Sequence, residues 1–268
     1  MKNKTPKFKV AVVQAAPVLF KLSASVKKAC DLIQETSKKG AELVLFPEAF
    51  IPAYPRGLTF GTVVGNRSDT GRDLWQIYWE NSVDIPGLKP TGAERIIWGE
   101  GDGSTLTTLD TPLGVIGGLI CWENYMPLAR NAMYRKGVQV YLAPTADQRE
   151  TWQSTLRHIA CEGRCFVLGC NQYVTKKMYP SDLPGIEDLD SQPEILSRGG
   201  SVIISPFGEI LSGPLFDQEG ILYADIDLTE VSRSKMDFDV VGHYARPDVF
   251  EVRVKDQPET IKIPPRGK

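Results

Sequence analysis

Hydrophobic residues fall along this chain in short runs that alternate between the two-residue period of strands and the 3.6-residue period of helices. Residues 8–14 are almost continuously apolar, as in a strand covered on both faces, and residues 42–46 form a second such run. Between them, three apolar residues recur at helical spacing with Ala29 beside them and predict a helix with these positions on its buried face: Val26, Cys30 and Ile33. Gly40 is placed to end that helix in a left-handed cap. The chain is therefore predicted to begin strand–helix–strand.

The same alternation continues to about residue 226. Further strands are predicted at residues 105–109, 115–121, 138–143, 166–173, 201–205, 209–212 and 221–226. Helices are predicted around residues 74–79, from Pro127 to Gly137, and around residues 152–160, with Trp75 and Trp79 interpreted as core. From Val231 the chain has no core pattern, so this tail is expected to reach another surface or subunit. The pattern predicts a mixed α/β fold.

Composition excludes several classes of protein. The 268 residues include 31 basic and 33 acidic side chains, and a net charge of -2 gives no basic face for nucleic acid. The apolar runs fall far short of the ~18 residues that a membrane span needs, and the first is too short for a signal peptide. We therefore expect a cytoplasmic protein with reduced thiols. Two histidines and five cysteines without CxxC spacing predict no metal site, and no GxGxxG or P-loop indicates a cofactor.

Two predicted strand ends carry groups that could do chemistry. Cys121 lies at the carboxyl end of a buried strand just before a helix, where open α/β sheets place ligands and where a thiolate is favoured. Glu48 follows the strand at residues 42–46 and could act as the base of that thiol. A core cysteine and a solvated loop charge are the alternative interpretations. Neither histidine is placed to be the base.

Four segments carry a specific resemblance: GGLICWENYMPLAR (117–130), GAELVLFPEAFIPAYP (40–55), WGEGDG (98–103) and APTAD (143–147). The first two resemble the nucleophile and glutamate motifs of the nitrilase (carbon–nitrogen hydrolase) superfamily, differing at Ala53, where glycine is common. The other two resemble segments typical of true nitrilases. The likeness runs from about Phe8 to Phe250. It implies a four-layer α-β-β-α sandwich, with one domain at residues 1–250 and a tail at residues 251–268.

The resemblance also implies roles for single residues. Cys121 would be the nucleophile, Glu48 the general base, and Glu94 the second glutamate that positions the family's lysine and the thiol. The chemistry would pass through a covalent thioimidate and a thioester, and it needs no cofactor. Candidate substrate-binding residues beside these motifs are Trp122, Glu123, Tyr54 and Thr145.

The family's lysine has no counterpart here. It lies in a basic stretch immediately before the segment that begins at Leu88, but here Gly87 stands there. The family places a helix and two strands between these points, so roughly 40 to 50 residues are absent at a junction near 86–88. Part of one sheet is therefore expected to be missing. Lys89 is a candidate stand-in for the lysine.

Three functional hypotheses follow from the resemblance. The first is a hydrolase that converts an organic nitrile, of aryl or arylalkyl type if the tryptophans line its pocket, to a carboxylic acid and ammonia. The second is a related amidase, or a nitrile or cyanide hydratase that stops at the amide. The third is a catalytically impaired homologue that serves as an assembly subunit. The resemblance also implies homo-oligomers.

Overall fold

The computed structural model describes residues 5–60, 69–81 and 101–257. Its helices are Leu22–Lys38 (α1), Asp69–Glu80 (α2), Pro127–Arg135 (α3), Glu150–Gly163 (α4) and Thr229–Ser234 (α5). Its strands are Lys7–Gln14 (β1), Ala41–Leu45 (β2), Thr108–Thr111 (β3), Gly114–Gly118 (β4), Val140–Pro144 (β5), Phe166–Cys170 (β6), Tyr173–Thr175 (β7), Ile195–Ile204 (β8), Ile210–Phe216 (β9) and Gly220–Asp227 (β10). Elements therefore lie close to the predicted ones.

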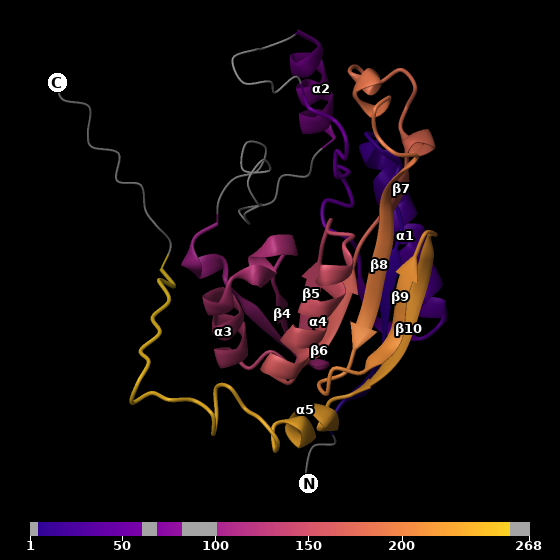
Figure 1. Cartoon of the computed structure of the whole chain (residues 1–268). Helices are drawn as coiled ribbons and strands as arrows, with labels where there is room; N and C mark the ends of the chain where they lie inside the picture. The colour runs from indigo at the N-terminus through magenta and orange to yellow at the C-terminus, as the bar shows by residue number, and fades with distance from the viewer. Residues whose placement is uncertain (1–4, 61–68, 82–100, 258–268) are drawn as a thin grey trace, which may run out of the picture.

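The described strands form two sheets of unequal width (Figure 1). The smaller has the order β10-β1-β2, with β1 antiparallel to β10 and parallel to β2. The larger has seven strands in the order β3-β4-β5-β6-β8-β7, with β9 paired to β8. Strands β4, β5 and β6 are parallel neighbours, so their carboxyl ends meet at one edge of that sheet.

The two sheets face one another across a shared hydrophobic core. Val10 and Val12 of β1 pack with Val140 of β5 and Leu168 of β6 in one buried cluster. Helices α3 and α4 cover the other face of the larger sheet, and α1 covers the outer face of the smaller one (Figure 1). These layers confirm the predicted four-layer α-β-β-α sandwich.

Helix α1 turns a different face to the sheet than its sequence predicts. Ala29 and Leu32 pack against the sheet, whereas the predicted stripe is exposed: Val26, Cys30 and Ile33. The two stripes lie side by side on a helix of 3.6 residues per turn. A sheet of three described strands covers only one of them, so the predicted burial of Cys30 is wrong.

One further expectation about burial is wrong. In α2 the side chains that pack inward are Leu74 and Tyr78, and Trp79 is 65% exposed. The tail packs on another surface of this chain, since Val240 contacts the α3/α4 cluster, but it also buries Val231 in the core between the sheets. Such contacts arise from single apolar residues, which carry no periodic signal.

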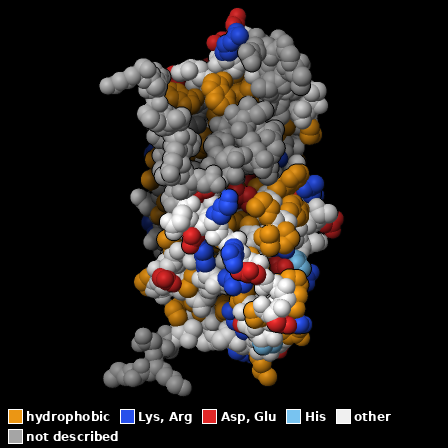
Figure 2. Space-filling view, turned by 90° about the vertical axis from the view of Figure 1, so that its left-hand side faces the viewer, with side chains coloured by type: hydrophobic (Ala, Val, Ile, Leu, Met, Phe, Trp, Pro, Cys, Tyr) orange, Lys and Arg blue, Asp and Glu red, His pale blue; other side chains and the backbone are white. Residues whose placement is uncertain are grey.

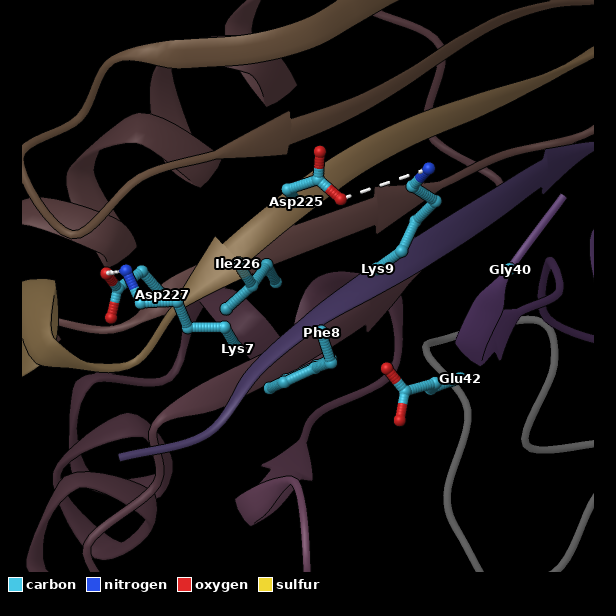
Figure 3. A pocket seen from close by; sticks show the side chains of 8 residues that line it. All are labelled: Lys7, Phe8, Lys9, Gly40, Glu42, Asp225, Ile226 and Asp227. Carbon is cyan, nitrogen blue, oxygen red and sulfur yellow. Dashed lines mark ion pairs between the residues drawn. The ribbon is translucent and has the colours of Figure 1, made fainter. Parts of the chain in front are cut away.

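The outer edge of the smaller sheet has a hollow of about 520 Å³, lined by residues of β1, β2 and β10 (Figure 3). Its charged side chains pair across the strands, Lys7 with Asp227 at 2.5 Å and Lys9 with Asp225 at 4.0 Å. Pairs this exposed contribute little to stability because water screens their charges. The hollow contains none of the predicted site residues. In the described part of the chain, no helix is long and apolar enough to cross a membrane.

Candidate active site

Cys121 lies on a tight turn immediately beyond β4. It begins the 3-10 turn Cys121–Tyr125, is 6% exposed, and has a φ of +46°, a conformation that side chains other than glycine rarely adopt. The chain reaches it past Gly118, where an added Cβ would lie 1.9 Å from the Leu142 carbonyl oxygen of β5. A glycine is therefore required there. Strained backbone at a nucleophile of this kind is a frequent feature of active sites.

The turn is held by the buried side chain of Asn124. Its Nδ2 donates hydrogen bonds of 2.8 Å to the carbonyl oxygens of Leu119 and Cys121, and its Oδ1 accepts one of 2.8 Å from Tyr141. The Glu123 carboxylate accepts a hydrogen bond of 2.9 Å from the Ile120 amide. Both side chains thus fix the backbone that carries Cys121, and a substrate contact for Glu123 stays a prediction.

An ion pair between Arg130 and Glu162 supports the backbone of Asn124. Arg130 donates to the Asn124 carbonyl oxygen at 2.7 Å and pairs with Glu162 of α4 at 2.8 Å. Tyr134 donates to the same carboxylate at 2.7 Å. Desolvation raises the pKa of Glu162, but the hydrogen bonds from Arg130 and Tyr134 outweigh it, so the pKa is lowered from its ordinary value of 4.5.

Replacing Glu162 with glutamine is expected to lower the free energy of unfolding by about 2–3 kcal/mol near pH 7, because Arg130 loses its charged partner while buried. A carboxyl with a depressed folded-state pKa stabilises the fold fully above about pH 4.5, and this contribution is lost as pH falls through the lowered pKa. Denaturant titrations from pH 3 to 7 should therefore show the difference between the two proteins shrinking toward acid.

The matched control for that series is Glu187→Gln, an exposed glutamate that should change stability little at any pH. A Glu162→Gln protein as stable as wild type at pH 7 would show that the ion pair does not support the turn.

Thr145 and Trp122, two of the predicted substrate-binding residues, lie beside Cys121, and their contact with a substrate stays a prediction. Thr145 follows β5 and its Oγ1 lies 3.3 Å from the Cys121 Sγ, with both side chains buried. Trp122 is 45% exposed and donates from Nε1 to Asp147 at 2.9 Å. Arg149 lies 4.9 Å over the Trp122 ring and pairs with Asp147. Trp122 thus presents a fixed flat surface beside the nucleophile.

Electrostatics keep Asp147 ionised. Desolvation raises its pKa, but hydrogen bonds from Arg149 and Trp122 and the charge of Arg149 together lower it below the ordinary value. The side-chain hydrogen bond and the charge of Asp147 in turn raise the pKa of Arg149. The two charges therefore largely neutralise one another.

Glu48 reaches this region from the loop that follows the smaller sheet's strand β2. It follows β2 in a partly buried loop, and its carbonyl oxygen accepts a hydrogen bond of 3.0 Å from Gln172, which follows β6. This bond links the strand ends of the two sheets. Arg56 interacts electrostatically with both Glu48 and Cys121, so the structure brings the predicted base and nucleophile to one region.

The same loop contains Ala53, where the family motif commonly has glycine. Ala53 is fully buried with a φ of +76°, a conformation that costs a non-glycine residue roughly 1 kcal/mol or more. Glycine is therefore the natural residue for this position. The carbonyl oxygen of Ala53 accepts a hydrogen bond of 3.1 Å from Tyr78. Tyr54, the next residue, lies with its ring 5.3 Å from the Arg56 guanidinium.

The sequence missed several residues of this region, and two predicted ones cannot be placed. Glu94 and Lys89 lie outside the described residues. Gln172 has the same strand-end position as Cys121 and Thr145, which could have indicated it. Asn124 lies within one motif and Arg56 directly follows the other, and neither has a further signal in the sequence. Among the described residues, no group of three or more His, Cys, Asp or Glu could hold a metal ion.

The fold is a layered α/β sandwich with a cysteine at the carboxyl ends of its parallel strands and a glutamate that follows a strand of the facing sheet. This arrangement is that of a cysteine-dependent hydrolase. The chain belongs to the carbon–nitrogen hydrolase family, whose sequence profile matches residues 9–87 and 76–236.

Curated relatives cover nearly the whole chain. An aliphatic nitrilase of Sinorhizobium fredii is 42% identical over 304 aligned positions, which take in 96% of this chain and 98% of the relative. The bifunctional nitrilase/nitrile hydratase NIT4B of Nicotiana tabacum is 43% identical over 306 positions, covering 95% and 88% of the two chains.

Solved structures agree on the fold. The carbon–nitrogen hydrolase of Helicobacter pylori superposes with a TM-score of 0.66 at 18% identity, covering 91% of this chain and 96% of its own. Nit3 of Saccharomyces cerevisiae gives a TM-score of 0.63 at 19% identity, covering 92% and 99%. Identities this low support the fold alone.

Proposed function

We propose that this chain hydrolyses an organic nitrile to a carboxylic acid and ammonia, with Cys121 as the covalent nucleophile. The observation that carries the proposal is the Cys121 turn, whose thiol lies at the strand edge within 3.3 Å of Thr145 Oγ1. The relatives named as nitrilases, which match along nearly the full chain, give the substrate class.

In the first half of the reaction Glu48 takes the thiol proton, and the Cys121 sulfur forms a bond to the nitrile carbon. The electron pair displaced from the carbon–nitrogen triple bond moves to nitrogen, which receives the proton from Glu48. The product is a neutral thioimidate bound to Cys121.

In the second half water adds to the thioimidate carbon, and the carbon–nitrogen bond breaks to release ammonia. This leaves a thioester, which a second water hydrolyses to the carboxylic acid while the proton returns to the sulfur. Two waters are consumed and no oxidant, metal or other cofactor enters the balance. Trp122, Glu123, Tyr54 and Thr145 are the proposed substrate-binding residues, and Glu94 is the proposed second glutamate.

The experiment that tests this function measures ammonia, acid and amide together from a panel of aryl, arylalkyl and aliphatic nitriles. Acid and ammonia in equal amounts are the expected products. Amide as the main product would favour a hydratase, the second candidate, which the bifunctional nitrilase/nitrile hydratase of tobacco suggests. A folded protein that yields neither product from any nitrile would refute the proposal and favour an assembly subunit.

We also propose that a segment was lost near residues 86–88 of an otherwise single domain at residues 1–250. The Sinorhizobium alignment spans 304 positions, whereas 96% of this 268-residue chain is about 257 residues, so roughly 47 positions have no counterpart here. The family profile also matches in two pieces that meet at residues 76–87. Both observations support the predicted loss of one helix and two strands.

Inserting the corresponding segment of the Sinorhizobium nitrilase between Gly87 and Leu88 is expected to raise kcat/KM about 10²-fold, because a preorganised cation returns to the site. Steady-state ammonia release measures the gain. The control is the same insertion with its family lysine changed to methionine, which should restore stability but little of the rate. An inserted chain that folds and gains no rate would contradict the proposed loss.

We further propose a homo-oligomer. Exposed hydrophobic side chains gather on the turn after Cys121 and the start of α3: Trp122, Tyr125, Met126 and Leu128. Figure 2 looks onto the side of the molecule where α3 lies and shows hydrophobic side chains exposed there among charges. Such a patch favours burial against another chain, and light scattering would measure the mass.

A further inference from the structure

Arg56 lies eight residues after Glu48 on the same loop, and three contacts fix it. Its Nη2 donates a hydrogen bond to the Ala146 carbonyl oxygen, and its guanidinium lies 5.3 Å from the centre of the Tyr54 ring. Its own carbonyl oxygen accepts a hydrogen bond of 2.9 Å from Tyr179. The backbone and the side chain of Arg56 are therefore both held in place.

These contacts bring the guanidinium to the nucleophile. Ala146 directly follows Thr145, the residue whose hydroxyl lies 3.3 Å from the Cys121 Sγ. Arg56 interacts electrostatically with Cys121 and also with Glu48. One cation therefore faces both the nucleophile and its base.

Arg149 also interacts electrostatically with Cys121, but its charge is already neutralised. Its Nε contacts both Asp147 carboxylate oxygens, at 2.9 and 3.1 Å, and its side chain is 54% exposed. Both the ion pair and the solvent weaken its field at the sulfur.

Arg56 differs in both respects. Its Nε is enclosed and has no hydrogen-bond partner among the described residues. Desolvation lowers the pKa of its guanidinium, partly offset by Tyr54, Glu48, Tyr179 and Cys121, and arginine keeps its charge at such shifts. An enclosed, incompletely paired charge is costly unless it serves the site.

We propose that Arg56 supplies the positive charge of this active site, where it favours the Cys121 thiolate and stabilises the charge that develops on the substrate nitrogen. The inference rests on the proposed function and makes Arg56, rather than Lys89, the group that compensates in part for the family's missing lysine. Arg56 acts on the thiol through its field and forms no covalent bond in the reaction.

The test follows the alkylation of Cys121 by iodoacetamide as a function of pH, quantified by mass spectrometry of the peptide that contains it. Arg56→Gln is expected to move the profile upward by about one pH unit, because the thiolate loses a nearby cation. Arg56→Lys keeps the charge and should stay closer to wild type than the glutamine variant. If the glutamine variant does not fold, Arg56→Met keeps the apolar stem on Tyr54 and serves as the neutral variant.

Arg164 is a matched control, because its Nε is also enclosed and without a hydrogen-bond partner in the part of the chain that the structure describes, and its guanidinium lies 5.7 Å from the Phe238 ring. Arg164→Gln should leave the alkylation profile unchanged. A folded Arg56→Gln protein with the wild-type profile would overturn the proposal. So would a shift of the profile in Lys89→Gln but not in Arg56→Gln.

Alkylation needs no nitrile, so the two proposals fail separately. A shifted profile without ammonia release would retain the charge assignment and refute the nitrile function. With an active protein, Arg56→Gln should lower kcat about 10²-fold and change KM less than threefold, since the charge is needed mainly in the transition state. Loss confined to KM would indicate a binding role and contradict the proposal.

Discussion

Cys121→Ala is expected to lower the rate of ammonia release from any nitrile substrate by ~10⁴-fold or more, because the covalent route disappears with the sulfur. Alanine retains the Cβ, so the turn that begins at Cys121 keeps its backbone contacts through Asn124. The thermal midpoint should therefore change little while kcat/KM collapses. Steady-state assays and a melt on the same preparation measure both.

The control is Cys161→Ala. Cys161 is a partly buried free thiol on α4 whose Sγ lies 3.7 Å from the Phe207 carbonyl oxygen, away from the residues that contact Cys121. That variant should keep wild-type activity. Ammonia release that persists in Cys121→Ala would place the nucleophile elsewhere.

Glu48→Gln is expected to lower kcat/KM by ~10³-fold to 10⁴-fold. Glutamine has nearly the same shape and leaves the Glu48 carbonyl bond to Gln172 intact, but it cannot take the thiol proton. Because the shape and this backbone bond are retained, the variant separates loss of the base from loss of the fold. The same change also removes a negative charge that interacts with Arg56. Initial rates of ammonia release over a range of substrate concentrations measure the effect.

Glu42→Gln is the paired control, since Glu42 lies on β2 itself but is exposed at the outer hollow (Figure 3). It should retain full activity. A Glu48→Gln protein with more than a tenth of the wild-type rate would exclude Glu48 as the base.

Much of the fold could be predicted because the buried strands are continuous apolar runs. β1 and β5 lie within two residues of their predicted bounds, and β6 begins at the predicted residue but ends three residues early. The predicted packing face of α4 is buried. β3 begins later than predicted because the Asp102 carboxylate accepts a hydrogen bond of 2.9 Å from the Ser104 amide and starts a 3-10 turn. Local side-chain capping of this kind has no hydrophobic period.

The site was predictable only in part. Cys121 and Glu48 follow strands, and their position indicated them as candidates, whereas Thr145 was indicated only by the family resemblance. Asn124 accepts a hydrogen bond from Tyr141, and Arg56 donates one to Ala146. Both contacts depend on the tertiary fold, and no spacing in the sequence encodes them. Trp79 and the exposed stripe of α1 were predicted as core because helical spacing shows that a face is apolar but not what covers it.

The pairing of β1 with β10 has a consequence for the order in which the site is made. Lys7 faces Asp227 and Gln14 faces Gly220, so this ladder closes a loop of more than two hundred residues. β2, which ends just before Glu48, is held in its sheet through β1. The strands behind Cys121 pair instead with close neighbours along the chain. During synthesis the β1–β2 pair and the strands behind Cys121 can therefore both form early, while the smaller sheet is completed only after β10 has left the ribosome.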